Sequence, residues 1–242
     1  MFRRSLLPSV MPRSGLRRSY GTWGMHVQTF APLAVALVLA LLAHGPTAAA
    51  GDRSVRIVVL GDSLTAGLGL PADEAFPAKL ERALKAKGLA IEVINAGVSV
   101  DTASGGLARL DWSVPEGTDA VILELGANDM LRGIDPKLTR QALEEIVRRL
   151  SARGVPVLLV GMRAAANLGN DYRRAFEALY SDLAGRYDLV LYPFFLDGVA
   201  GEAGLNQSDG LHPTAAGVDA IVARILPKVE ELVRRARNGR AM

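Results

Sequence analysis

The sequence predicts an α/β fold in which helices cover both faces of one parallel β-sheet. Two observations lead to this prediction. Short apolar runs rich in Val, Ile and Leu alternate along the chain with longer segments whose apolar residues recur at helical spacing. Polar, glycine-containing turns follow the first three runs, and right-handed crossovers would bring these turns to one rim of the sheet.

Five short runs of β-branched and aliphatic residues are predicted as strands, because turn-forming residues bound them. They cover residues 56–60, 91–94, 120–125, 155–160 and 189–192. The first stops at Gly61, the second at Asn95-Ala96-Gly97 and the third at Gly126-Ala127-Asn128-Asp129. Strands that alternate with helices in this way are typical of a parallel sheet.

Amphipathic helices are predicted between and after these strands. The first carries Phe76 and Leu80 on one face and ends at Gly88, since glycine is common just past a helix. A short helix is expected around Leu107 and Leu110. The later helices are expected to begin at Asp135-Pro136, where a cap precedes a proline, at Asn170 or Asp171, and at Pro213-Thr214, the last reaching about Arg235.

Residues 1–50 have the composition of a secretory leader. They contain five arginines and no acidic residue, then an apolar run over residues 30–43 and an A-x-A pattern at Ala48-Ala49-Ala50. We therefore expect a cleaved signal peptide over residues 1–50, one domain over residues 51–242, and a periplasmic or secreted location. An uncleaved anchor is the alternative, although the apolar run is shorter than the roughly 20 residues that span a membrane.

Removal of the leader changes the charge of the chain. Of 28 basic residues, the five leader arginines are lost, which leaves 23 against 25 acidic residues and a net charge near −2. Nothing in this balance indicates nucleic acid as a partner. The chain has no cysteine, which excludes disulfides, a thiolate nucleophile and cysteine-bound metal. Neither a metal nor another cofactor is expected.

One histidine belongs to the predicted domain, because His26 and His44 lie in the leader and His212 does not. A general base of the histidine type must therefore be His212. Asp209 stands three residues earlier, a spacing that lets its carboxylate reach the imidazole, and Ser63 follows the first strand at a sharp turn that exposes its hydroxyl. The alternative is structural: Ser63 caps the next helix, and Asp209 and His212 cap the last one.

Asn128 stands at the end of the third strand, after Gly-Ala. An amide N–H in this place can stabilise the negative charge that develops on a carbonyl oxygen, although asparagine is also a common turn residue. Asp129 is expected to brace this loop, or to replace Asp209 as the group that orients His212.

Three short motifs follow one another along the chain. They are Gly61-Asp62-Ser63-Leu64, Gly126-Ala127-Asn128-Asp129 and Asp209-Gly210-Leu211-His212-Pro213. Together they resemble the motifs of the GDSL/SGNH hydrolase family, and the resemblance extends over nearly all of residues 54–235. It is greatest to the periplasmic branch described as acyl-CoA thioesterase I, lysophospholipase and arylesterase.

The resemblance implies a flavodoxin-like, three-layer fold with a five-stranded parallel sheet of order 2-1-3-4-5. It implies Ser63 as nucleophile, His212 as base and Asp209 as its partner. The oxyanion hole would consist of the Ser63 backbone N–H, a second backbone N–H and the Asn128 side chain. The second N–H belongs here to Val100, where the family has glycine. Valine disfavours positive φ, and its side chain can crowd the acyl group.

These features together predict a serine hydrolase of acyl esters and thioesters, lysophospholipids included, that acts as a monomer without a cofactor. The residues expected to line the acyl groove are Leu131, Ile134, Leu168 and Phe195. A carbohydrate O-acetyl esterase is the nearest alternative. A flavodoxin-like module that cradles a phosphate or flavin in the 61–67 turn is an alternative of another class, but it does not explain why His212 follows Asp209.

Overall fold

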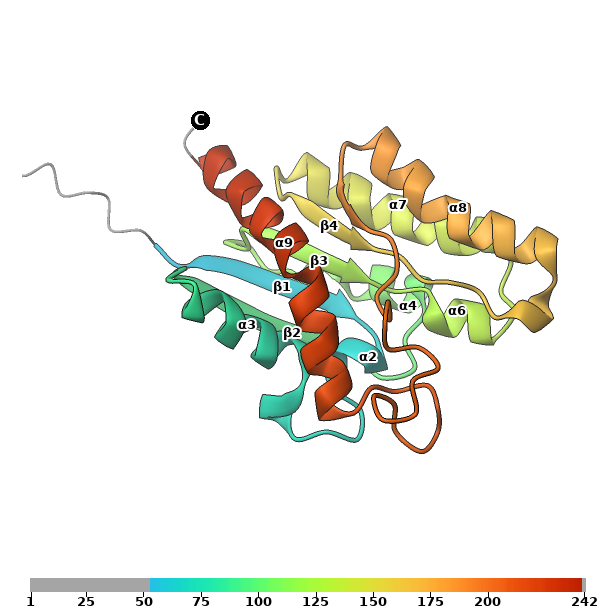
Figure 1. Ribbon diagram of the computed structural model, residues 1–242. Helices are drawn as coiled ribbons and strands as arrows, with labels where there is room; N and C mark the ends of the chain where they lie inside the picture. The colour runs from blue at the N-terminus through green and yellow to red at the C-terminus, as the bar shows by residue number, and fades with distance from the viewer. Residues whose placement is uncertain (1–52, 241–242) are drawn as a thin grey trace, which may run out of the picture. The chain divides into compact units, whose positions relative to one another are not determined.

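Five parallel strands form the central sheet of the molecule, whose computed structural model describes residues 53–240 (Figure 1). The strands are β1 (Val55–Gly61), β2 (Ile91–Gly97), β3 (Ala120–Glu124), β4 (Val157–Val160) and β5 (Val190–Tyr192). Their order across the sheet is β2-β1-β3-β4-β5, as predicted. The direction of chain progression reverses at β1 and β3, and such a switch point opens a crevice at the carboxyl ends of the strands.

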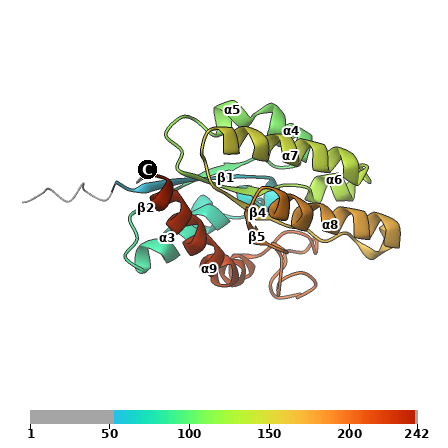
Figure 2. The same ribbon diagram turned by 90° about the horizontal axis from the view of Figure 1, so that it is seen from above.

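Helices cover both faces of the sheet, so the predicted three layers are present (Figure 2). On one face lie α3 (Phe76–Ala86) and α9 (Ala215–Arg240), which pack against each other. On the other face lie α4 (Ala103–Ala108), α5 (Leu110–Ser113), α7 (Pro136–Ala152) and α8 (Asn170–Arg186). The short helices α2 (Ser63–Ala66) and α6 (Ala127–Leu131) begin just after β1 and β3, and the 3₁₀ turns η1 (Ala72–Glu74) and η2 (Ala166–Leu168) precede α3 and α8.

The elements differ from the predicted ones mainly at their ends. β2 extends to Gly97, three residues beyond its predicted end, because it pairs with β1 along its whole length. The single short helix expected near Leu107 is two helices, α4 and α5. The last helix begins at Ala215, because the Thr214 hydroxyl accepts a hydrogen bond from the Gly217 backbone N–H (3.2 Å) and caps its first turn.

The middle of the sheet is buried on both faces, which explains the unbroken apolar runs in the sequence. Every residue of β3 and β4 is buried, as are six of the seven residues of β1, whereas the edge strand β2 is mostly half-buried. Helix α7 turns Leu143, Ile146 and Leu150 toward this core at helical spacing. The packed centre therefore fixes the carboxyl ends of the strands, and the functional side chains stand just beyond them.

No helix within residues 53–240 is long and apolar enough to cross a membrane. The same residues contain no group of three or more His, Cys, Asp or Glu side chains placed to hold a metal ion. The predicted signal peptide, residues 1–50, lies outside the described residues and stays a prediction from sequence.

Candidate active site

Ser63 stands on a tight turn between β1 and α2. Gly61 ends the strand, and a Cβ there would lie 2.8 Å from the Glu124 carbonyl oxygen, so no larger residue fits. The Asp62 side chain caps α2 by accepting a hydrogen bond from the Leu64 backbone N–H (3.0 Å). Ser63 follows as the first residue of the helix, with 8% of its surface exposed. The turn thus presents one hydroxyl at the carboxyl rim of the sheet.

The imidazole of His212 lies between Ser63 and Asp209. Its Nε2 is 2.9 Å from Ser63 Oγ, and its Nδ1 is 2.6 Å from Asp209 Oδ2. A proton on Nδ1, facing the carboxylate, leaves Nε2 free to accept the serine proton. The fold thus brings together the three side chains that the sequence singles out, although 149 residues separate the serine from the histidine.

Asp209 holds the loop before α9 as well as the imidazole. Its Oδ1 accepts hydrogen bonds from the backbone N–H groups of Leu211 (2.9 Å) and His212 (3.0 Å). The backbone bond from His212, followed by the imidazole bond and the bond from Leu211, holds the pKa of Asp209 well below its usual range. Asp209 is therefore a carboxylate wherever the imidazole can act as a base.

Gln207 joins the loop that carries His212 to the segment that follows Ser63. Its backbone N–H donates to the His212 carbonyl oxygen (2.7 Å). Its side-chain amide donates to the carbonyl oxygens of Leu68 (2.7 Å) and Pro213 (2.9 Å). Gln207 therefore fixes the position of the His212 loop relative to the segment that carries Ser63.

Of the predicted oxyanion donors, some already donate hydrogen bonds within the protein and others do not. Within residues 53–240, no hydrogen bond uses the backbone N–H of Ser63 or of Val100. The Asn128 amide instead donates to Asp62 Oδ2 (3.1 Å) and to the Asp101 carbonyl oxygen (3.0 Å), which accounts for both of its hydrogens. The two backbone N–H groups are thus available to a substrate oxygen. The Asn128 amide can reach that oxygen only if one of its N–H groups is shared with, or released from, its present acceptor.

Val100 adopts a backbone conformation that valine rarely takes, contrary to the expectation from sequence. Its φ is +64°, in the left-handed region, and its carbonyl oxygen accepts a hydrogen bond from Arg132 Nη2 (2.7 Å). The left-handed region costs a residue with a Cβ about 1–2 kcal/mol. The Val100 side chain is 66% exposed, so packing offsets little of this strain. Val100 thus has the backbone conformation that glycine adopts most easily.

Replacing Val100 by glycine is expected to leave the free energy of unfolding unchanged or to raise it. Relief of the left-handed strain, about 1–2 kcal/mol, opposes the greater chain entropy of glycine, about 0.4–1 kcal/mol. We expect kcat/KM to stay equal or to rise, most for bulky acyl groups, because the proposed donor is the backbone N–H. Urea denaturation and ester kinetics measure both effects.

The matched control for this substitution is Val100→Ala, which keeps the Cβ and therefore most of the strain. It should show no gain in stability. A tenfold loss of activity in a folded Val100→Gly protein would contradict the prediction, because it would mean that the valine side chain itself is needed.

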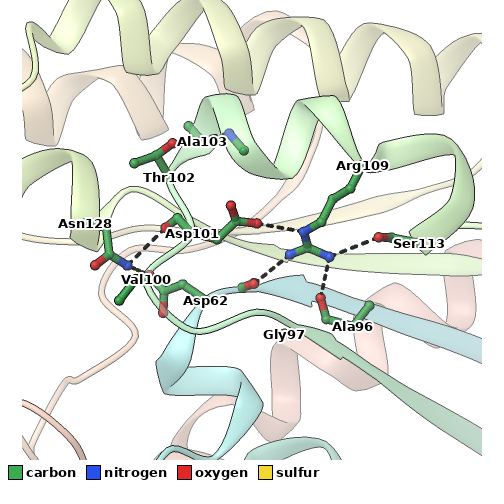
Figure 3. A network of polar contacts seen from close by, with 12 residues as sticks. Asp62, Ala96, Gly97, Val100, Asp101, Thr102, Ala103, Arg109, Ser113 and Asn128 are labelled. Carbon is green, nitrogen blue, oxygen red and sulfur yellow. Dashed lines mark hydrogen bonds and ion pairs between the residues drawn. The ribbon is translucent and has the colours of Figure 1, made fainter.

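A buried arginine ties the strand ends to the loop after β2 (Figure 3). Arg109 Nε donates to Asp101 Oδ2 (2.6 Å), and the other guanidinium nitrogens donate to the carbonyl oxygens of Gly61 (2.9 Å) and Ala96 (2.7 Å) and to Ser113 Oγ (3.0 Å). Arg109 is only 7% exposed, so these acceptors and the Asp101 carboxylate offset the burial of its charge. The Asp101 carbonyl oxygen accepts the hydrogen bond from the Asn128 side chain. Arg109 therefore supports the candidate oxyanion hole indirectly, through Asp101.

Two carboxyl groups lie buried beneath the nucleophile turn. Asp62 and Glu124 are 0% and 1% exposed, and the Asp62 backbone N–H donates to Glu124 Oε2 across 3.5 Å. Burial raises the pKa of Asp62 to about 6. Burial, together with the charge of Asp62, also raises the pKa of Glu124 well above its usual range, and Glu124 Oε1 has no hydrogen-bond partner among the described residues. The turn that carries Ser63 thus rests on groups that resist ionisation.

A largely apolar cleft of about 360 Å³ adjoins the Ser63 hydroxyl and the His212 imidazole. Val100 and Asn128 also border it, so the candidate oxyanion donors face the same space. The larger apolar side chains that line the cleft are Leu64, Leu68, Met130, Leu131, Met162, Phe194, Leu196 and Leu211. Of the four residues expected to line an acyl groove, Leu131 is among them.

The other three expected groove residues do not border this cleft. Phe195 is fully buried and packs edge to face against Phe76, with ring centroids 5.1 Å apart, and its neighbour Phe194 lines the cleft instead. Ile134 lines a separate hollow between α4 and α7, and Leu168 is half-buried against the core. At this place the cleft is therefore lined by Phe194 and not by Phe195, because the chain turns after β5 and directs the Phe195 side chain into the core.

Asp129 braces the loop after β3, which is one of the two roles expected for it. It is 1% exposed, and it accepts hydrogen bonds from the Ala103 backbone N–H (2.9 Å) and the Thr139 hydroxyl (3.0 Å). These bonds join α6 to α4 and α7. The Nδ1 atom of His212 is held by Asp209 instead.

Several residues that support the site from below are not predictable from the sequence. Arg109 donates to the ends of β1 and β2 and to Asp101, and Asp101 accepts from Asn128, so their roles depend on contacts that no local pattern reveals. Glu124 offered a signal, because a carboxylate inside an otherwise apolar strand is rarely buried without a reason. Arg163, which also lines the cleft, belongs to no motif.

Comparisons with known proteins agree with this geometry. The family model described as "GDSL-like Lipase/Acylhydrolase family" matches residues 59–220, a segment that contains all three side chains of the Ser–His–Asp contact. Esterase TesA of Pseudomonas aeruginosa is 38% identical over 178 residues, which cover 73% of this chain and 89% of that protein. Thioesterase 1/protease 1/lysophospholipase L1 of Escherichia coli K12 is 37% identical over 187 residues, which cover 77% of this chain and 87% of that protein.

A solved structure gives the same result for the fold. The crystal structure of AlinE4, described as an SGNH-hydrolase family esterase, superposes with a TM-score of 0.63 at 46% identity, covering 74% of this chain and 96% of that one. Similarity to proteins named esterases and thioesterases, together with a serine hydroxyl in contact with an imidazole, favours hydrolysis over the phosphate- or flavin-binding alternative.

Proposed function

Because the chain belongs to the GDSL-like lipase/acylhydrolase family and is a hydrolase of esters and thioesters, we propose that Ser63, His212 and Asp209 form its catalytic triad. One observation carries this proposal. An unbroken line of short contacts, 2.9 Å and 2.6 Å, runs from the serine hydroxyl through the imidazole to the carboxylate. A serine hydroxyl is a weak nucleophile until a base accepts its proton, and this line of contacts supplies the base.

In the proposed reaction, Ser63 Oγ attacks the acyl carbonyl carbon while His212 Nε2 takes the hydroxyl proton. The Asp209 carboxylate stabilises the resulting imidazolium. The tetrahedral intermediate collapses as the imidazolium protonates the departing alcohol or thiol, which leaves an acyl group on Ser63. A water molecule that gives its proton to His212 then releases the acid and restores the serine.

The negative oxygen of the tetrahedral intermediate is stabilised by the backbone N–H groups of Ser63 and Val100 and by the Asn128 amide. Support for this assignment comes from the two backbone N–H groups, which no hydrogen bond within residues 53–240 uses. The charge develops only as the carbonyl is attacked, so these donors stabilise the transition state more than the bound substrate.

The dimensions and lining of the cleft support acyl groups longer than acetyl. Its volume is about 360 Å³, and side chains such as Leu131, Met162 and Phe194 give it an apolar surface. Each methylene that leaves water for such a surface contributes about 0.8 kcal/mol. This favours aliphatic esters, thioesters and lysophospholipids over the carbohydrate O-acetyl esters of the alternative function.

A panel of substrates tests this function. It contains p-nitrophenyl esters from acetyl to palmitoyl, acyl-CoA thioesters, lysophospholipids and acetylated sugars. We expect kcat/KM to rise with acyl length beyond acetyl until the cleft is filled. Fastest hydrolysis of acetylated sugars would favour the O-acetyl esterase instead, and hydrolysis of none of the substrates would refute the proposal.

We propose further that the enzyme acts outside the cytoplasm and as a monomer. The leader-like composition of residues 1–50 supports export. N-terminal sequencing of exported protein should begin within a few residues of Gly51, and a mature chain that retains residues 30–43 would indicate an anchor.

A further inference from the structure

The cleft carries a single fixed charge, the guanidinium of Arg163. None of the other residues that line it in the described chain is an arginine, lysine, aspartate or glutamate, and His212 is the only other side chain there that can become a cation. Most of the remaining lining is apolar. One cation in an apolar, concave site favours a ligand that brings a negative charge to the same place.

Arg163 has no anionic partner within residues 53–240. No hydrogen bond or ion pair engages its guanidinium, which lies over the Phe194 ring with Cζ 4.7 Å from the ring centroid. Glu177, an acid whose Oε1 accepts a bond from the Ala164 backbone N–H (3.3 Å), forms no ion pair with it. The stacking orients the planar guanidinium and leaves its N–H groups available. Arg132, on the same rim, is instead occupied by the Val100 carbonyl oxygen.

Backbone contacts between the loops after β4 and β5 fix Arg163 beside Phe194. The Phe195 backbone N–H donates to the Gly161 carbonyl oxygen (2.9 Å). A Cβ on Gly161 would lie 2.3 Å from the Pro193 carbonyl oxygen, so the two loops approach as closely as glycine permits. The guanidinium and the ring that supports it are thus held together by the fold.

The sheet also sets how far Arg163 lies from the proposed nucleophile. Ser63 follows β1 and Arg163 follows β4, with only β3 between these strands. Neighbouring strands are about 4.8 Å apart, so the two positions are separated by roughly 10 Å across the sheet. A substrate with its carbonyl at Ser63 can therefore present a second group to Arg163.

We propose that Arg163 forms an anion subsite, which binds a carboxylate or phosphate carried by the substrate on the side of the cleft that lies two strands from Ser63. The inference rests on the proposed role of Ser63, because the subsite is placed relative to that residue. Both kinds of anion suit a guanidinium, which can donate two parallel N–H bonds to either. The anion can belong to the far end of the acyl chain or to the leaving group.

Two pairs of substrates test the subsite, each pair differing in one anionic group. The acyl pair is p-nitrophenyl octanoate and the p-nitrophenyl monoester of octanedioic acid. The leaving-group pair is 1-octanoylglycerol and 1-octanoylglycerol 3-phosphate. For each pair, the ratio of kcat/KM for the charged ester to kcat/KM for the neutral ester is measured in the wild type, Arg163→Gln, Arg163→Lys and Arg149→Gln. Arg149 is the matched control, because it pairs with Asp111 and lies outside the cleft.

Arg163→Gln is expected to lower this ratio about tenfold or more in at least one pair, as loss of a charge-assisted hydrogen bond would. Arg163→Lys, which keeps the charge but not the planar fork, should lower it less. Arg149→Gln should leave the ratio at the wild-type value. The pair that responds shows whether the anion belongs to the acyl or the leaving group.

A ratio that Arg163→Gln leaves unchanged in both pairs would overturn the subsite. So would an equal fall in Arg149→Gln, since that would reflect the overall charge of the protein. Hydrolysis of the neutral esters by the wild type separates these outcomes from a failure of the proposed function, which would abolish activity on every ester and overturn both proposals.

Discussion

Replacing Ser63 by alanine is expected to lower kcat by about 10⁴-fold or more, because the members of a catalytic triad act as a unit. The substitution removes the only atom that can form the acyl-enzyme and leaves His212 Nε2 without its 2.9 Å partner. His212→Ala should lower kcat by a similar factor, and Asp209→Asn by less or about as much. The activity that survives would come from substrate binding and the backbone donors alone.

Ester kinetics and thermal unfolding of each variant measure this prediction. We expect the unfolding midpoint of Ser63→Ala to stay near that of the wild type, because within residues 53–240 the hydroxyl bonds only to the imidazole. Ser181→Ala is a matched control: this exposed serine on α8 donates to the Ala178 carbonyl oxygen, and its loss should not change kcat. If Ser63→Ala kept most of its activity while His212→Ala lost it, the nucleophile would be another group.

Replacing Asn128 by alanine is expected to lower kcat by roughly 10²–10³-fold, or about 2.7–4 kcal/mol of transition-state stabilisation. KM should change little, because the bond to the oxygen strengthens only as negative charge develops. The amide also donates to Asp62 Oδ2 and the Asp101 carbonyl oxygen, so a modest loss of stability should accompany the loss of rate.

The split between kcat and KM distinguishes the two roles of this amide. A purely structural amide would lower the unfolding midpoint and would show no selective effect on kcat. Asn95→Ala is the matched control, since Asn95 is another asparagine near the end of a strand, and it bonds to Gly97 and Ala66 outside the cleft. A wild-type rate for Asn128→Ala would remove the residue from the oxyanion hole.

Much of the fold could be predicted because its elements are recorded locally in the sequence. Strands buried on both faces appear as unbroken apolar runs, and the capping residues mark where α7 and α9 begin. The order of the strands cannot be predicted in this way, because the spacing of strands along the chain does not say which of them are neighbours. The strand order came from the family resemblance of the three motifs. The contact between Ser63 and His212 was foreseeable because the predicted domain has only one imidazole.

The rest of the site depends on contacts between segments that are distant in sequence. Val100 keeps a positive φ in the fold, although valine locally prefers the opposite sign. Whether Phe194 or Phe195 faces the cleft depends on the turn that follows β5, which places Phe194 in the cleft wall and Phe195 in the core. Arg109 acquires its role only when the ends of β1 and β2 meet it.

The carboxyl pair beneath the nucleophile turn makes the folded protein a stronger proton acceptor than the unfolded chain. Burial raises the pKa of Asp62 from 3.8 to about 6, and it raises that of Glu124 as well. Between about pH 4 and 6 the unfolded chain therefore releases protons that the folded protein keeps, so the contribution of this pair to stability is fully present in acid and is lost as the pH rises. Above this pH range the carboxyl pair under the nucleophile turn therefore lowers the free energy of unfolding, and burial of the apolar strands offsets this cost.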